Sequence, residues 1–239
     1  MNKIFICADT HGLMDIKKIK NLVKTKQPDY SDYIIICGDV GIGWNDEITK
    51  ELIEFYESLG TNVLFIDGNH ENFIKLRNYT FENWNGGVSY KISEHIRFLE
   101  RSQIFNICGK NFLTLGGGNS HDIEHRVEGV DWFKEENILK ADVDMAIELV
   151  RMRNLKIDYI LTHTPNQIFA DLLYDRFTQC GEEFPLFLQK KYINNESGKR
   201  LNIIANKIKF KKWFCGHWHI DESIGKYVML YENIFEILL

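Results

Sequence analysis

Proline and long apolar runs are both scarce in this sequence of 239 residues. The 3 prolines, against 17 glycines, leave little material for a proline-rich linker. No window approaches the roughly 18 uninterrupted apolar residues that suggest a membrane-spanning helix. The apolar N-terminal run, Met1 to Ala8, is too short for the core of a signal peptide. We therefore expect no membrane partner.

Disulfide scaffolds and nucleic-acid coats are also disfavoured. The five cysteines are odd in number and form no Cys-x-x-Cys pair, which favours a reducing, cytoplasmic environment. The 29 Lys+Arg and 34 Asp+Glu give a net charge of −5, whereas a nucleic-acid coat needs a basic surface. Nucleic acid is therefore not a favoured partner. With 44% hydrophobic and 26% charged residues, the composition is that of an ordinary globular protein.

The N-terminal third alternates between buried strands and amphipathic helices. Strands are predicted at 3–8, 33–37 and 62–66, and helices at 13–26 and 46–59. Such alternation predicts parallel strands with helices covering the faces of the sheet.

Further along, the pattern changes to short strands with tight polar breaks. Consecutive, antiparallel strands are expected at 88–92, 96–99, 104–108 and 112–115. After them we expect helices at 134–153, 167–174 and about 200–210, and strands at 157–161, 212–215, 220–224 and 227–231. No repeat or linker interrupts the chain, so a single domain over 1–239 is predicted.

Five predicted buried strands are each followed directly by His, Asp or Asn side chains. The segments are Asp9-Thr10-His11, Gly38-Asp39, Gly68-Asn69-His70-Glu71, Thr162-His163-Thr164 and Gly216-His217-Trp218-His219. Loops at the carboxyl edge of a parallel sheet converge, so these side chains are expected in one crevice. The glycines before Asp39, Asn69 and His217 are expected to let the backbone turn sharply.

Seven of these side chains form a set of metal ligands with oxygen and imidazole donors and no thiolate. They are Asp9, His11, Asp39, Asn69, His163, His217 and His219. Such donors suit Mn²⁺, Fe²⁺ or Zn²⁺. Seven groups are too many for one ordinary site, whereas two ions that share a bridging carboxylate use them all.

The order DxH, GD, GNHE, a single His after a strand, and GHxH resembles the calcineurin-like metallophosphoesterases, including small bacterial and phage members. The resemblance runs from Asp9 to His219. It implies an α/β fold, a four-layer α/β/β/α sandwich with two mixed β-sheets flanked by helices. It also implies two divalent ions, Mn²⁺ foremost, with Fe²⁺, Zn²⁺, Ni²⁺ and Mg²⁺ as alternatives.

The same resemblance assigns roles to the ligands. Asp9, His11 and His219 would hold one ion and Asn69, His163 and His217 the other, with Asp39 bridging both. His70 matches the catalytic histidine that contacts the scissile phosphate or the leaving group, and Asn69 and His70 are both expected to bind substrate. The implied reaction is hydrolysis of a phosphate mono- or diester, on a small or nucleotide-like substrate, by in-line attack of a hydroxide that bridges the ions.

The resemblance to the phosphoprotein phosphatases is weaker. There the GD motif continues to an Asp that orients the catalytic histidine and an Arg that grips phosphate, but here Ile42 and Gly43 stand at those positions. Asp46 and Glu71 are both candidates to orient His70. A substitute for the missing guanidinium is Arg126, in a Ser120-x-Asp122-x-x-x-Arg126 pattern like one in small bacterial and phage members. We expect it to bind substrate phosphate, the alternative being a surface ion pair.

Other functions remain open at this point. A nuclease would need a basic, aromatic groove, for which the lysines at 207, 209, 211 and 212 are the only candidates, while Trp44 and Trp84 offer rings for stacking on a base. A phosphoprotein phosphatase is a further alternative. A non-catalytic metal-binding scaffold is the least favoured, because all seven ligands and His70 are present.

Overall fold

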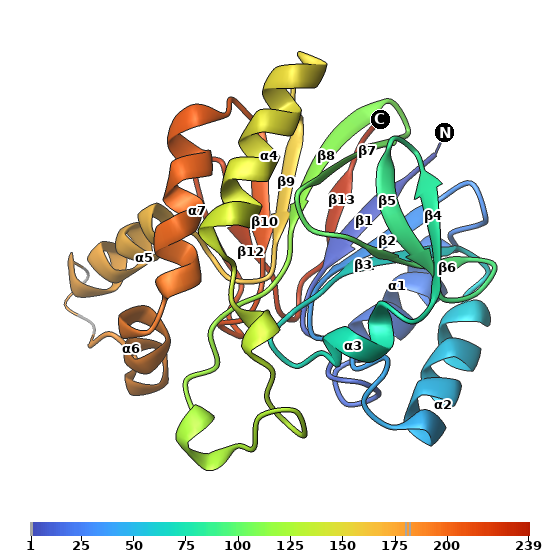
Figure 1. Ribbon diagram of the computed structural model, residues 1–239, viewed down its shortest axis with the longest axis horizontal. Helices are drawn as coiled ribbons and strands as arrows, with labels where there is room; N and C mark the ends of the chain where they lie inside the picture. The colour runs from blue at the N-terminus through green and yellow to red at the C-terminus, as the bar shows by residue number, and fades with distance from the viewer. Residues whose placement is uncertain (1, 180, 182) are drawn as a thin grey trace.

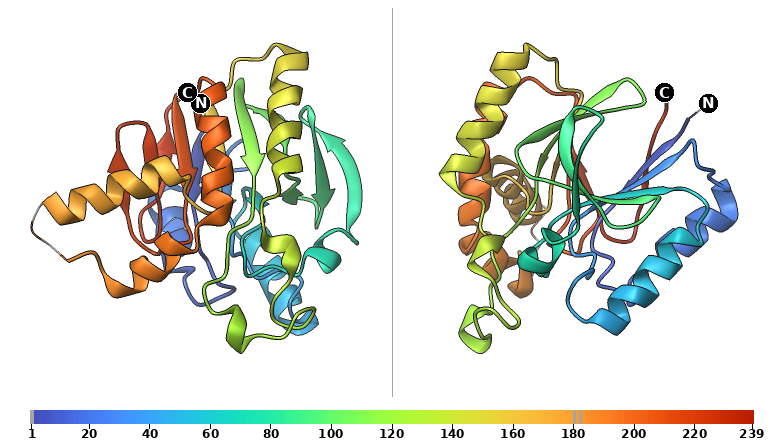
Figure 2. Two further views of the ribbon diagram at one scale, coloured as in Figure 1. Left: turned by 60° about the vertical axis from the view of Figure 1, so that its left-hand side comes forward. Right: turned by 45° about the vertical axis from the view of Figure 1, so that its right-hand side comes forward.

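The computed structural model describes residues 2–179, 181 and 183–239 (Figure 1). Over these residues the strands form two mixed sheets, of seven and six strands. Helices cover the outer face of each sheet, and the sheets pack against each other through their inner faces (Figure 2). The predicted four-layer α/β/β/α sandwich is therefore confirmed.

The first sheet holds the N-terminal strands and the last strand of the chain. Its strand order is β13-β1-β2-β3-β6-β5-β4. The strands are β1 (Ile4–Cys7), β2 (Tyr33–Cys37), β3 (Asn62–Ile66), β4 (Thr80–Trp84), β5 (Gly87–Lys91), β6 (Ile96–Leu99) and β13 (Phe235–Ile237). The central strands β1, β2, β3 and β6 are parallel, and the outer three pair antiparallel. Helices α1 (Lys17–Lys26), α2 (Asp46–Glu57) and α3 (Phe73–Leu76) contribute to the core on its outer face.

The second sheet has the order β11-β12-β10-β9-β8-β7. Its strands are β7 (Gln103–Ile107), β8 (Lys110–Leu115), β9 (Tyr159–Thr162), β10 (Lys212–Cys215), β11 (Glu222–Ile224) and β12 (Tyr227–Met229). The central strands β8, β9, β10 and β12 are parallel. Its outer core is completed by helices α4 (Lys140–Arg153), α5 (Gln167–Gln179), α6 (Leu186–Ile193) and α7 (Glu196–Lys207).

Alternate residues of one strand serve two different cores, which is why the strands read as continuous apolar runs. In β1, Phe5 and Cys7 pack with the residues of α1 and α2, whereas Ile4 and Ile6 face the second sheet. Successive side chains of a strand point to opposite faces, so a strand buried on both faces needs apolar residues throughout.

The expectation of consecutive antiparallel strands over 88–115 is wrong in one respect. β5 with β6 and β7 with β8 do pair antiparallel. However, the chain crosses between the sheets after β6, and β6 itself pairs parallel with β3. Short apolar segments with polar breaks do not show which sheet a strand joins, because both sheets bury strands of the same kind.

Several element boundaries also differ from the predictions. The expected helix from residue 13 begins only at Lys17, because His11 and Gly12 have positive φ angles and the segment before the helix is turned. The expected helix from 134 is a 3₁₀ turn, η2 (Lys134–Glu136), followed by α4. α5 runs five residues beyond its expected end at 174, and α7 begins earlier than expected, at Glu196. β4, β13, α3 and α6 were not predicted. Among the described residues, no helix is long and apolar enough to cross a membrane.

Candidate metal centre

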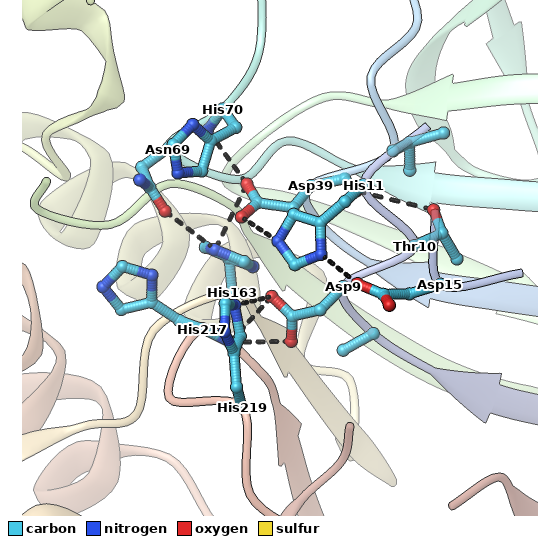
Figure 3. Close-up of polar contacts among 12 residues, drawn as sticks. Asp9, Thr10, His11, Asp15, Asp39, Asn69, His70, His163, His217 and His219 are labelled. Carbon is cyan, nitrogen blue, oxygen red and sulfur yellow. Dashed lines mark hydrogen bonds and ion pairs between the residues drawn. The ribbon is translucent and has the colours of Figure 1, made fainter. Parts of the chain in front are cut away.

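The five loops singled out in the sequence meet at one edge of the two sheets (Figure 3). Asp9 and His11 follow β1, Asp39 follows β2, and Asn69 and His70 follow β3 in the first sheet. His163 follows β9, and His217 and His219 follow β10 in the second sheet. Parallel strands place all these loops at their carboxyl ends, so two sheets contribute to one crevice.

One group of side chains brings four ligand atoms close together. The carboxylates of Asp9 and Asp39 and the imidazoles of His11 and His219 each offer one atom, and these atoms lie within 4.8 Å of one another. His11 Nε2 is 3.4 Å from Asp39 Oδ2, and His219 Nε2 is 3.6 Å from Asp9 Oδ1. Two carboxylates and two imidazoles are donors that hold a divalent cation.

A second group lies on the other side of Asp39. His163 Nε2 is 3.4 Å from Asp39 Oδ1 and 3.0 Å from Asn69 Oδ1. The ring of His217 lies beside that of His163, with 4.9 Å between the ring centroids. The Asp39 carboxylate thus faces one group with each of its oxygens.

The residues present fit a divalent ion. Asp39 is 1% exposed, yet its Oδ2 atom has no hydrogen-bond partner among the residues described. A buried carboxylate oxygen without a partner is costly, and a bound cation would compensate it. The donor set, which lacks thiolates, matches hard and borderline divalent ions.

Two imidazoles are held so that Nε2 faces the carboxylate. His11 Nδ1 lies 2.7 Å from Asp15 Oδ2, and His163 Nδ1 lies 2.8 Å from the carbonyl oxygen of Cys37. When Nδ1–H donates to these acceptors, the lone pair of a neutral ring is left on Nε2. Asp15 was missed in the sequence, although its spacing of four residues from His11 was a usable signal.

Burial and pairing set the charges in the centre. Burial raises the pKa of Asp39, but the neighbouring His163, His70 and His11 lower it further, so the pKa of this carboxyl lies well below its usual range. Burial lowers the pKa of His163, but Asp39 raises it to about 9. Burial keeps the pKa of His217 well below its usual value. Binding of a cation to His163 would therefore require that this ring lose a proton. His217 is already neutral and would need no such loss.

The backbone at the centre is strained. Five of the seven predicted ligands adopt positive φ angles between 43° and 68°, namely Asp9, His11, Asp39, His217 and His219. The left-handed region is uncommon for residues other than glycine, although Asp, Asn and His tolerate it better than most, and strain of this kind gathers at functional sites.

The glycines beside the ligands have two different roles. Gly38 has a φ of +87°, which fits the predicted sharp turn. Gly68 and Gly216 are not in the positive-φ region, which differs from the prediction. They are required for close approach, since a Cβ at Gly68 would lie 2.0 Å from Asp39 Oδ1 and one at Gly216 would lie 2.2 Å from Asp9 Oδ2.

A buried chain of hydrogen bonds orients Asn69. Its Nδ2 donates to Ser120 Oγ at 3.0 Å, and the Ser120 hydroxyl donates to Glu136 Oε2 at 2.7 Å. The amide oxygen is thereby turned toward His163. Glu136 lies in the η2 turn that replaces the start of the predicted helix, and nothing local in the sequence pointed to this role.

Arg126, predicted to bind substrate, contacts the ring of His70. Its Nη1 lies 3.2 Å from His70 Nδ1, and its Nη2 donates to Asp122 Oδ2 at 2.9 Å. Of the two candidates to orient His70, Asp46 pairs with Lys75 at the surface, and Glu71 Oε1 accepts the backbone N–H of Val40. Asp46 is thus engaged elsewhere, Glu71 bonds through Oε1 only and leaves its buried Oε2 without a partner among the described residues, and the Arg126 guanidinium contacts the imidazole.

A model of the calcineurin-like phosphoesterase domain matches residues 2–221. The chain belongs to the calcineurin-like phosphoesterase family. A calcineurin-like phosphoesterase is a metal-dependent hydrolase of phosphate esters, which agrees with the ligand atoms gathered around Asp39. A comparison with curated proteins finds no significant match.

Solved structures share the fold of this calcineurin-like phosphoesterase. One crystal structure has a TM-score of 0.55 and 15% sequence identity, covering 95% of this chain and 89% of its own. The crystal structure of TT1561 of Thermus thermophilus has a TM-score of 0.53 and 10% identity, covering 96% of this chain and 88% of its own. At these identities the likeness extends to the fold alone.

Replacing Gly68 with alanine should weaken metal binding. The new Cβ would lie 2.0 Å from Asp39 Oδ1 and 2.5 Å from the Asp39 backbone nitrogen, so the carboxylate and its loop must both shift. We therefore expect Mn²⁺ affinity, measured by isothermal titration calorimetry on variant protein shown to be folded by circular dichroism, to fall at least about tenfold. Gly60→Ala is the control for a glycine substitution away from the centre: Gly60, unlike Gly68, has a positive φ (+68°), and a Cβ there meets nothing within 4 Å in the described part of the chain. It should lower the free energy of unfolding by about 1 kcal/mol and leave Mn²⁺ affinity unchanged. Equal affinities of the two variants would contradict the prediction.

Asp15→Asn should also reduce metal affinity, although Asp15 is not itself among the predicted ligands. The amide removes the negative charge that fixes His11 Nδ1–H, so a loss of about 10–100-fold in Mn²⁺ affinity is expected from titration. Asp46→Asn, a change at an exposed carboxylate outside the centre, should have no such effect. Wild-type affinity in the Asp15 variant would show that His11 is oriented without this contact.

Proposed function

We propose that this chain hydrolyses a phosphate mono- or diester, on a small or nucleotide-like substrate, with two divalent ions held around Asp39. The observation that carries the proposal is the Asp39 carboxylate, which faces His11 with one oxygen and His163 with the other. Asp9, His11 and His219 would complete one site, and Asn69, His163 and His217 the other. Mn²⁺ is the favoured ion, since the donors are oxygen and imidazole.

When bound, two such ions supply Lewis acidity for phosphate oxygens and activate water as a nucleophile. The chain's own residues position the substrate and determine which ring nitrogen of His70 carries the proton. Asn69, fixed through Ser120, presents its amide beside His163 and next to His70, where a phosphate ester would enter.

The contact with Arg126 sets the tautomer of His70. A guanidinium can only donate, so His70 Nδ1 accepts from Arg126 Nη1, and the proton of the neutral ring is at Nε2. Burial lowers the pKa of His70, which keeps the ring neutral near pH 7. We propose that Nε2–H hydrogen-bonds to the leaving oxygen and stabilises the negative charge that develops there as the ester bond breaks, while water supplies the proton, and that Arg126 binds a phosphate oxygen beside it.

The positions of other residues weigh against a nuclease. Lys207, Lys209, Lys211 and Lys212 lie at or before the start of β10, whereas His217 and His219 follow its end, so these lysines are at the opposite edge of the sheet. Lys211 also pairs with Asp158. For a phosphoprotein phosphatase, the usual Asp and Arg positions are taken by Ile42, which is buried in the core, and Gly43.

The function can be tested with protein stripped of metal and reloaded with Mn²⁺. We expect it to hydrolyse p-nitrophenyl phosphate or bis-p-nitrophenyl phosphate, and the preferred ester to separate monoesterase from diesterase activity. Asp39→Asn should lose both bound ions, measured by elemental analysis, and its turnover should fall to background. A wild-type protein that binds no divalent metal would overturn the proposal. Two bound metals without turnover of either ester would favour a scaffold or a narrowly specific enzyme.

His70→Ala separates stabilisation of the leaving group from metal binding. We expect kcat to fall by about 10²–10³-fold, because the hydrogen-bond donor to the leaving oxygen is lost, while the metal content stays at the wild-type value. The rate loss should be smaller for esters with good leaving groups, such as p-nitrophenol, than for alkyl esters. A loss of bound metal in this variant would instead assign His70 to the metal centre.

A further inference from the structure

A cavity of about 540 Å³ opens directly beside the candidate metal centre. His11, Asp39, His219 and His70 form its polar side. The cavity is also lined by four large side chains that the metal centre does not use, which together form its wall: Met14, Trp44, Ile48 and Tyr231. The cavity is therefore lined partly by polar side chains of the metal centre and partly by large, mainly apolar side chains.

The wall exposes apolar surface to solvent. Met14 is 75% exposed and Ile48 is 45% exposed. Exposed apolar side chains that gather beside polar reactive groups are typical of ligand-binding surfaces. Methionine, with its flexible and polarisable side chain, packs well against aromatic rings.

The two aromatic rings of the wall are held in place. Trp44 Nε1 donates to the backbone carbonyl oxygen of His70 at 2.5 Å. Tyr231 stacks on the ring of His219, with centroids 4.9 Å apart and an angle of 18° between planes. Both rings are thus fixed relative to His70 and His219. Trp84, the other candidate for stacking, packs against Tyr33 and Phe105 and does not line the cavity, whereas Trp44 packs against Phe133 and also lines the cavity.

The wall offers no cationic side chain to an anion. Among the described residues that line the cavity there is no lysine or arginine, and the one charged group outside the metal centre's predicted ligands is the Asp15 carboxylate. A substrate with a second phosphate or a carboxylate here would lose hydration without gaining an ion pair from the wall.

We infer that this cavity binds the organic group of the substrate and selects phosphate esters in which that group is uncharged and aromatic. The inference rests on the proposed function, because the cavity is the substrate side of the same centre. Trp44, Met14 and Tyr231 are then specificity-determining residues, and the ester's charge is confined to the phosphate that faces the metal ligands.

Binding of non-hydrolysable phosphonates tests this without the reactivity of different leaving groups. Calorimetry on Mn²⁺-loaded protein would compare methylphosphonate, phenylphosphonate and 4-carboxyphenylphosphonate. We expect phenylphosphonate to bind about tenfold more tightly than methylphosphonate, because its ring is buried against the wall. The added carboxylate should remove most of that gain.

Substitutions in the wall test which side chains cause the preference for the phenyl ring. Met14→Ala and Trp44→Ala should abolish most of the preference for the phenyl ring, while Trp44→Phe, which keeps a ring but loses the bond to His70, should retain it. Met152→Ala, a change at an exposed methionine on α4, is the matched control and should change nothing. Affinity for methylphosphonate reports in every variant that the metal centre is intact.

The two ways to fail are distinguishable. Equal affinities for methyl- and phenylphosphonate, or an undiminished preference in both alanine variants, would overturn the inference and leave the phosphoesterase proposal standing. If metal-loaded protein binds none of the phosphonates, the proposed function itself fails, and the inference with it.

Discussion

The candidate metal centre depends on keeping the carboxylate of Asp39 ionised in the protein interior. An uncompensated buried anion costs several kcal/mol or takes up a proton. Here three histidines hold the pKa of Asp39 low, and the backbone N–H of His70 donates to its Oδ1 at 2.9 Å. Its Oδ2 atom still has no hydrogen bond from the described residues. Charge is thus maintained while one position around the carboxylate stays open for a cation.

The loops that form this arrangement have a strained backbone. Each residue other than glycine in the left-handed region costs about 1 kcal/mol, and five of the predicted ligands are in it. Three separate apolar cores, two under the helices and one between the sheets, hold the strands from which these loops leave. Short loops that leave fixed strand ends have few alternative conformations, so tertiary packing offsets the local strain.

The sequence predicted the layers and the ligand loops because both follow from local patterns: buried strands are continuous apolar runs, and polar residues mark where each strand ends. It did not predict the partners that orient the ligands. Asp15 reaches His11 through a turn rather than a helix, and Glu136 reaches Asn69 through Ser120, so both contacts exist only after folding. The crossing of the chain between the sheets after β6 was not predicted either. Which sheet a strand joins is decided by packing and not by the strand's own residues.

Two buried lysines place positive charge beside the candidate metal centre of a chain whose net charge is −5. Lys18 Nζ donates to the backbone carbonyl oxygens of Ala8 and Asp9, and Lys191 Nζ donates to that of His217. Both side chains are less than 9% exposed. Burial lowers the pKa of Lys191, and the nearby carboxylates of Asp9 and Asp39 partly offset this by raising it. The two ammonium groups bind main-chain oxygens and leave the side chains of the ligands alone, while the backbone N–H of His217 donates to the Asp9 carboxylate at 2.9 Å. The charge of two divalent cations would exceed the negative charge of the two ligand carboxylates. The lysine charge behind the loops adds to this positive potential. A nearby potential acts on a substrate more strongly than the distant acidic residues of the surface do.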